Sequence, residues 1–123
     1  MDISRAQSVL LEVIRNVLER FAFMFCEMEE DQRFQNWRGV CLQAFISFSG
    51  SHKATIRVTA PETLCLEMAG NILGLAPDEV QPEDGMDALK ELVNVVCGEL
   101  TPALYGDKEI FELSVPEAIR IEP

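Results

Sequence analysis

Two neighbouring stretches in which side chains alternate between two faces constrain the fold of this chain most strongly. Residues 40–48 alternate throughout, and residues 54–59 alternate again with Ile56 and Val58 inward. A period of two residues is typical of β-strands. The turn Ser49–His52 joins the two stretches, so the sequence predicts an antiparallel hairpin. One face of the first strand carries Val40, Leu42, Ala44, Ile46 and Phe48.

A long helix is expected before the hairpin. Over residues 4–29, an apolar stripe lies within about 60° of Ile14 on a helical wheel and polar residues lie opposite; the stripe consists of Leu10, Val17, Leu18, Phe21, Phe25 and Met28. Ser4 is the expected N-cap. Residues 29–38 are polar and predict a turn. The stripe predicts a helix that faces a core on one side.

Two more helices are expected after the hairpin. The first has Pro61 in its first turn and ends at Gly74. Its helical spacing continues through Leu64, Met68 and Ile72. An acidic loop follows over residues 75–85, and the second helix covers residues 86–104. We expect a break near Thr101–Pro102, because proline has no backbone N–H to donate.

The chain then returns to an extended pattern. Tyr105–Asp107 predicts a turn, residues 110–115 alternate as a strand that ends at Pro116, and residues 119–123 predict a short edge segment. No linker or low-complexity tract divides the chain, so we expect one domain over residues 1–123. The predicted fold class is an α/β (α+β) sandwich, with long helices packed on an antiparallel β-sheet.

Charge and cysteine content exclude several classes of function. The chain has 21 acidic and 10 basic residues, so its net charge is −11 and its surface repels nucleic-acid phosphates and anionic lipids. The most apolar stretch, residues 9–28, contains five charged residues, which argues against membrane insertion. The four cysteines have no zinc-like spacing and His52 is the single histidine, so we expect reduced thiols, no metal site and a cytoplasmic location.

The helix expected over residues 86–104 has a polar face that admits two interpretations. Its apolar residues share one side, and Asp87, Glu91, Asn94 and Gly98 lie on the opposite side. Any surface helix shows acids and amides opposite its core stripe, so a solvated face explains the pattern. Asparagine and glycine are, however, unfavourable inside a helix, which favours a flat, polar docking surface. The core side consists of Leu89, Leu92, Val93, Val96, Cys97 and Leu100.

These residues resemble a known signature. Asp87-xxx-Glu91-xx-Asn94, followed downstream by a strand that ends in Pro116, resembles the motif of the CheC/CheX/FliY chemotaxis phosphatases. The resemblance covers residues 86–119 well, whereas the earlier part agrees in element order. It implies a CheC-like fold and hydrolysis of the aspartyl phosphate of a CheY-type response regulator.

The resemblance also implies roles for single residues. Asn94 would enter the regulator's active site and orient the attacking water, since an amide both donates and accepts hydrogen bonds. Glu91 would pair with the regulator's active-site lysine. Asp87, Lys90 and Gly98 would contact the same partner. Mg²⁺ would be held by the regulator, so we expect no cofactor in this chain.

The first helix indicates which branch of the family the chain resembles. CheC-like members carry two active helices, but here Glu12 is followed by Arg15 at the asparagine position, and Asn16 is one residue late. We therefore expect one active helix, as in CheX. Chains of that branch continue into further strands, whereas this sequence ends at Pro123, so we expect a shorter sheet with an exposed edge, and monomer and homodimer both stay open.

Other candidates carry less weight. His52 lies in the predicted turn and is expected to be a surface residue, while Trp37 and Tyr105 are expected to pack. An acidic cluster lacks the spacing of a calcium loop and is expected to be solvated. The acidic cluster consists of Asp78, Glu79, Glu83 and Asp84.

The alternative to a phosphatase is a non-catalytic adaptor of the same fold, which binds a response regulator or a signalling complex.

Overall fold

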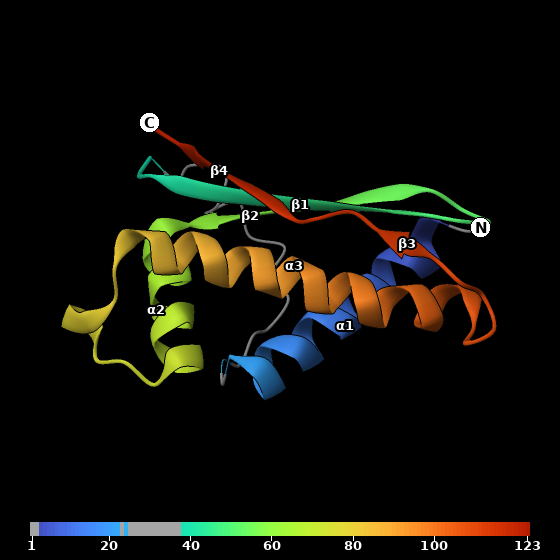
Figure 1. Cartoon of the computed structure of the whole chain (residues 1–123), viewed down its shortest axis with the longest axis horizontal. Coiled ribbons are helices and arrows are strands. Elements are labelled where there is room, and N and C mark those ends of the chain that lie inside the picture. Colours follow the sequence, from blue (N-terminus) through green and yellow to red (C-terminus); the bar gives the residue numbers. More distant parts are fainter. Residues whose placement is uncertain (1–2, 23, 25–37) are drawn as a thin grey trace.

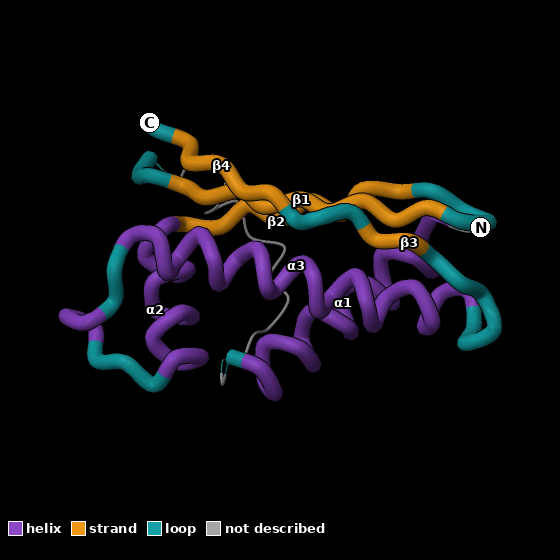
Figure 2. Tube along the Cα trace, viewed as in Figure 1, coloured by secondary structure: helices purple, strands orange, loops and turns teal. Residues whose placement is uncertain are grey.

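An antiparallel sheet forms one layer of the structure and helices form the other (Figure 1). The computed structural model describes residues 3–22, 24 and 38–123. Figure 2 shows that the described helices all cover the same face of the sheet. Along the chain the elements are α1 (Ile3–Phe21), β1 (Cys41–Ser49), β2 (Ala54–Pro61), α2 (Glu62–Leu73), the short 3-10 helix η2 (Pro77–Glu79), α3 (Pro82–Tyr105), β3 (Glu112–Leu113) and β4 (Glu117–Ile121).

The strand β1 is the centre of the sheet. It pairs with β2 along one side, from Cys41 opposite Pro61 to Phe48 opposite Ala54, which confirms the predicted antiparallel hairpin. On its other side β1 pairs first with β3 and then with β4, both antiparallel. The predicted edge segment near the end of the chain is confirmed, although β4 already begins at Glu117.

The strand predicted over residues 110–115 is wrong in length, because only Glu112–Leu113 pairs as β3. The register against β1 shifts by one residue between β3 and β4, so the segment around Ser114 and Pro116 contains one extra residue, as in a β-bulge. Ser47 N–H donates to Ser114 Oγ at 2.9 Å instead of to a backbone carbonyl. Pro116 has no N–H for the ladder, and the regular strand resumes after it.

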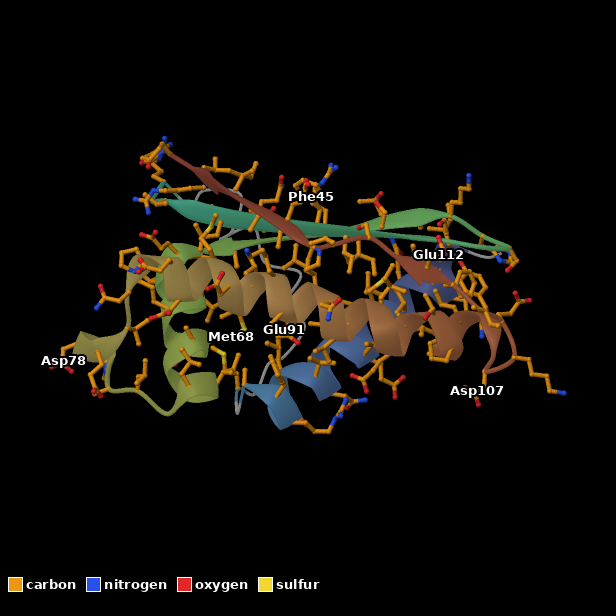
Figure 3. All side chains as sticks on the ribbon, in the orientation of Figure 1. Phe45, Met68, Asp78, Glu91, Asp107 and Glu112 are labelled. Atoms are coloured by element: carbon orange, nitrogen blue, oxygen red, sulfur yellow. The ribbon has the colours of Figure 1, made fainter. Side chains whose placement is uncertain are left out.

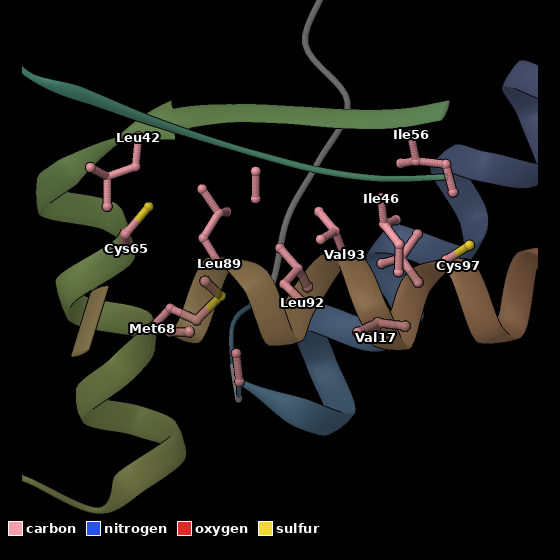
Figure 4. Close-up of a cluster of buried hydrophobic side chains, with 14 of the residues drawn as sticks. Val17, Leu42, Ile46, Ile56, Cys65, Met68, Leu89, Leu92, Val93 and Cys97 are labelled. Carbon is pink, nitrogen blue, oxygen red and sulfur yellow. The ribbon is translucent and has the colours of Figure 1, made fainter. Parts of the chain in front are cut away.

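The core lies between β1 and α3, and the alternation read in the sequence decides which residues enter it. Leu42, Ala44, Ile46 and Phe48 are buried, while the intervening residues of β1 are only partly covered. Figure 4 shows Leu42 and Ile46 of β1 on the side of the sheet that faces the buried side chains of α3. The six predicted core residues of this helix are all buried, namely Leu89, Leu92, Val93, Val96, Cys97 and Leu100.

The first helix is shorter than predicted. It ends at Phe21, where the N–H groups of Ala22 and Met24 both donate to the Leu18 carbonyl, at 3.1 and 3.0 Å. Ser4 lies inside α1 rather than before it, so its prediction as the N-cap is wrong. Residues 25–29 of the predicted helix, nearly all of the predicted turn at 29–38, Cys26 and Trp37 lie outside the described residues.

The second helix ends as predicted but begins only after Pro61. Gly74 follows α2 in the left-handed conformation, with φ of +69°, where glycine has no steric penalty. Pro61 is the last residue of β2 and precedes α2, instead of lying in its first turn. None of the described helices is long and apolar enough to cross a membrane.

The third helix is longer than predicted at its start and is not broken near its end. It begins at Pro82, because proline suits the first helical position and because the Asp84 carboxylate accepts the Gln81 N–H at 2.8 Å. Four residues of the predicted loop therefore belong to α3, and three more form η2. Contrary to the predicted break, α3 continues through Thr101 and Pro102 to Tyr105.

Candidate functional site

The side of α3 that faces away from the core carries the residues singled out in the sequence. Asp87, Glu91 and Gly98 are exposed and Asn94 is half-buried, and their spacing places them on one side of the helix. Figure 3 shows Glu91 on the side of α3 that points away from the sheet. We call these four residues the α3 stripe. Their predicted placement on one polar face is confirmed.

The opposite side of α3 holds the stripe in place. Leu89, Val93 and Val96 have no exposed surface and lie against β1 and the neighbouring helices. Both α1 and α2 pack against α3, and α2 crosses it steeply (Figure 1). Burying a side chain of this kind contributes about 1.5–3 kcal/mol. The stripe therefore projects from a helix whose orientation is set by the core rather than by the stripe itself.

Two members of the stripe have side chains without partners in the described part of the chain. There, no hydrogen bond or ion pair involves the Glu91 carboxylate or the Asn94 amide. Asp87, in contrast, forms an ion pair with Lys90 one turn later, with 3.4 Å between Oδ1 and Nζ. Such exposed pairs contribute little stability. Glu91 and Asn94 thus present an acceptor carboxylate and a donor–acceptor amide to the surroundings.

A hollow of about 270 Å³ lies between α2 and α3, beside the stripe. One side of the hollow is aliphatic and comes from α2, and Asp87 and Glu91 belong to its acidic side on α3. This combination suits a lysine side chain, whose stem packs on apolar surface while its ammonium group meets a carboxylate. The hollow is lined by Ala69, Ile72, Leu73, Asp84, Asp87, Ala88 and Glu91.

The contribution of α2 to this hollow was not predicted. Reading the helix by its period identified Leu64, Met68 and Ile72, but not Leu73. Leu73 is 54% exposed although it is a large aliphatic residue. An additional leucine next to the expected core position was the signal that could have found it.

Other residues considered in the sequence contribute to the fold rather than to the stripe. His52 stacks on Tyr105 with ring centroids 4.3 Å apart, so these two residues join the hairpin turn to the end of α3. Glu83 and Asp84 belong to the first turn of α3 instead of to a loop. In the part of the chain that the structure describes, no group of three or more histidine, cysteine or acidic residues is arranged to hold a metal ion.

Two described cysteines are inaccessible thiols. Cys65 and Cys97 have no exposed surface. Burial raises the pKa of each to about 11, and the nearby Glu62 carboxylate adds to the effect at Cys65. Cys41 is half-buried and is also a free thiol. The buried thiols are therefore poor nucleophiles and act as small core residues.

The comparison with protein families is decisive for the class of protein. Residues 42–123 match the family model described as chemotaxis phosphatase CheX. The chain belongs to the CheX family. The matched segment contains the whole α3 stripe and the core strand β1 from its second residue. No relative was found among proteins of curated function.

Solved structures of the CheX and CheC-like group share the fold. The chemotaxis protein CheX from Vibrio vulnificus is 23% identical with a TM-score of 0.74, over 93% of this chain and 73% of that one. A CheC-like superfamily protein from Shewanella sp. PV-4 is 25% identical with a TM-score of 0.70, over 97% and 77%. CheX in a CheX–CheY–BeF3–Mg²⁺ complex from Borrelia burgdorferi is 16% identical with a TM-score of 0.65, over 93% and 75%. The predicted CheC-like α+β fold is thereby confirmed.

Proposed function

We propose that this chain hydrolyses the aspartyl phosphate of a CheY-type response regulator, with α3 as its docking helix. The observation that carries the proposal is the pair of Glu91 and Asn94, whose side chains have no partner among the described residues and lie on the exposed side of a core-anchored helix, in a chain of the CheX family. The CheX of Borrelia burgdorferi forms a complex with CheY, which supports the choice of partner. Free thiols fit a reaction in the reducing cytoplasm.

Asn94 is the proposed catalytic residue. Its amide oxygen can accept a hydrogen bond from a water molecule while its NH₂ group donates another, so it can orient the attacking water without acting as a strong base. Phosphoryl transfer depends chiefly on positioning and charge stabilisation, so an ordered water is a sufficient contribution from this chain. Any Mg²⁺ would be held by the regulator's own acidic residues.

Glu91 is the proposed residue that fixes the partner's register. Its carboxylate lies at the hollow between α2 and α3, where the aliphatic side chains of Ile72 and Leu73 could cover the stem of a lysine. A lysine ammonium from the regulator would then meet Glu91 and, secondarily, Asp87. The net charge of −11 favours approach of a basic patch on the partner.

The test follows the decay of a phosphorylated, Mg²⁺-loaded CheY-type regulator from the same genome, with and without this chain. Asn94→Ala should lower the acceleration by about 100-fold with little change in affinity, because only the water loses its orientation. Glu91→Ala should weaken binding by about tenfold, and more so at low salt, because a charge pair is lost.

Matched controls are available on α1. Asn16 and Glu12 are exposed there and lie outside the stripe, so Asn16→Ala and Glu12→Ala should leave both decay and affinity unchanged. Full activity in Asn94→Ala would contradict the mechanism. Binding of the regulator without faster decay in the unchanged chain would favour the non-catalytic adaptor instead.

A further inference from the structure

We infer that the backbone carbonyl of Gly98, released by Pro102, is a second docking point on α3 for the proposed partner. The inference rests on the proposed function, since it assumes a response regulator seated on the α3 stripe. It assigns a new contact to that partner, namely an N–H or O–H donor on a segment that touches the helix backbone. Gly98 and Pro102 are both unfavourable inside a helix, and both affect the surroundings of the same carbonyl oxygen.

Among the described residues, nothing packed around Gly98 requires a glycine. Gly98 is exposed in the middle of α3, and a Cβ built at this position would meet no heavy atom of the described residues within 4 Å. Gly85 in the same helix differs, because its Cβ would lie 3.1 Å from Leu66 Cδ2. Packing thus explains Gly85 but not Gly98. An exposed, open glycine in a helix leaves the backbone uncovered toward whatever approaches it.

Pro102 lies four residues after Gly98 in the same helix. It has no N–H, so the Gly98 carbonyl lacks the donor that position i+4 supplies elsewhere in a helix. The helix is otherwise well bonded here, since Thr101 Oγ1 donates to the Cys97 carbonyl at 3.3 Å and Gly106 N–H donates to the Pro102 carbonyl at 2.8 Å. The Gly98 carbonyl therefore lacks its i+4 donor, while α3 stays continuous through Pro102.

The acceptor lies on the side of α3 that the proposed partner would cover. Gly98 belongs to the stripe and follows Asn94 by one turn, about 6 Å along the axis. A regulator that receives the Asn94 amide in its active site would extend over this turn. A glycine without a Cβ allows the partner's chain to approach closely, and the carbonyl can accept its hydrogen bond.

The test measures affinity for a CheY-type regulator held in its active form with Mg²⁺ and beryllofluoride, by calorimetry. Pro102→Ala returns an N–H to position 102, which occupies the Gly98 carbonyl. We expect its dissociation constant to rise by about three- to tenfold, as for one lost hydrogen bond. Gly98→Ala adds a Cβ on the contact surface without a clash inside the chain, and we expect a similar loss of affinity.

The matched control is Pro82→Ala. Pro82 is exposed at the first position of α3, where no helical carbonyl awaits its N–H, so affinity should stay unchanged. Thermal melting of each variant excludes loss of folding, since both Pro102→Ala and Gly98→Ala should raise the melting temperature.

Three outcomes separate the two proposals. Weaker binding by both variants with intact or raised melting temperatures supports the inference. Unchanged affinity in both, beside an unchanged chain that binds the regulator and speeds its dephosphorylation, refutes the inference and leaves the proposed function standing. If the unchanged chain does not bind the regulator at all, the proposed function and the inference fall together.

Discussion

Replacing Gly98 by alanine should stabilise the folded chain, and the size of the effect follows from its surroundings. Alanine is favoured over glycine in a helix interior by about 1 kcal/mol. The new Cβ would meet no heavy atom of the described residues within 4 Å, so no packing term from them opposes this gain. We therefore expect the free energy of unfolding to rise by about 1 kcal/mol, and the melting temperature by about 3–6 °C for a chain of this size.

Gly85→Ala is the matched comparison, because it makes the same chemical change in the same helix. Its Cβ would lie 3.1 Å from Leu66 Cδ2 and 3.6 Å from Leu42 Cδ1, so α2 and β1 restrict it. Overpacking of a core typically costs about 1–3 kcal/mol, which cancels or exceeds the gain in helix propensity. We expect Gly85→Ala to be neutral or destabilising.

Urea unfolding followed by far-ultraviolet circular dichroism measures both variants under one protocol. The free energies of unfolding of Gly98→Ala and Gly85→Ala should differ by at least about 1 kcal/mol, with equal slopes against urea. Equal stabilities, or a loss of stability in Gly98→Ala, would refute the argument that Gly98 has open space around it. That result would also remove the reason to assign Gly98 to a partner.

Two further predictions concern the helices around the site. Arg20 donates to both carboxylate oxygens of Glu99, at 2.6 and 2.8 Å, and so joins α1 to α3. A double-mutant cycle with alanine at both positions should give a coupling energy of about 0.2–1 kcal/mol that falls in 1 M salt. A coupling energy of zero at low salt would contradict this prediction. Burial raises the pKa of Cys65 and Cys97 to about 11, so the unfolded chain releases these protons first and stability should fall as pH rises from about 9 to 11. The profile of a variant with alanine at both cysteines should be flatter over that range, and identical profiles would argue against the shift.

The strands and the core side of α3 could be predicted because their periods are set by burial alone. Leu42, Ala44 and Ile46 are buried at every second position, and Leu89, Val93 and Val96 are buried at helical spacing. A shift of the strand by one residue would place these side chains in water, so the pattern determines which face is buried. The same reasoning placed Glu91 and Asn94 on the exposed side, while their roles stay predictions.

The ends of elements could not be predicted with the same success, because single hydrogen bonds decide them. The start of α3 depends on the contact between Gln81 and the Asp84 carboxylate, which is a local alternative to a loop. Residues 110–115 have the alternation of a longer strand, yet Ser114 and Pro116 interrupt the pairing with β1. At Pro102 the packing of α3 against the sheet and the other helices outweighs the preference of proline against helix interiors.

The hollow beside the stripe is lined by residues of two helices, so the helical wheel of a single helix does not show it. Asp87 and Glu91 were identified from α3, but their aliphatic neighbours Ile72 and Leu73 come from α2. The angle at which α2 meets α3 results from packing over the whole core, which no local pattern encodes. Sites that lie between elements are therefore the part of such a protein that sequence reasoning finds last.

The position of the stripe on α3 determines how much conformational entropy this chain would lose when a partner binds. Nine buried residues belong to α3, and it packs against α1, α2 and β1, so this helix should open only when the whole chain unfolds. A partner that docks on it meets a backbone that is already ordered, and little conformational entropy is lost by this chain on binding. Any large unfavourable entropy measured for the complex would then have to originate in the partner or in the long side chains of Glu91 and Lys90.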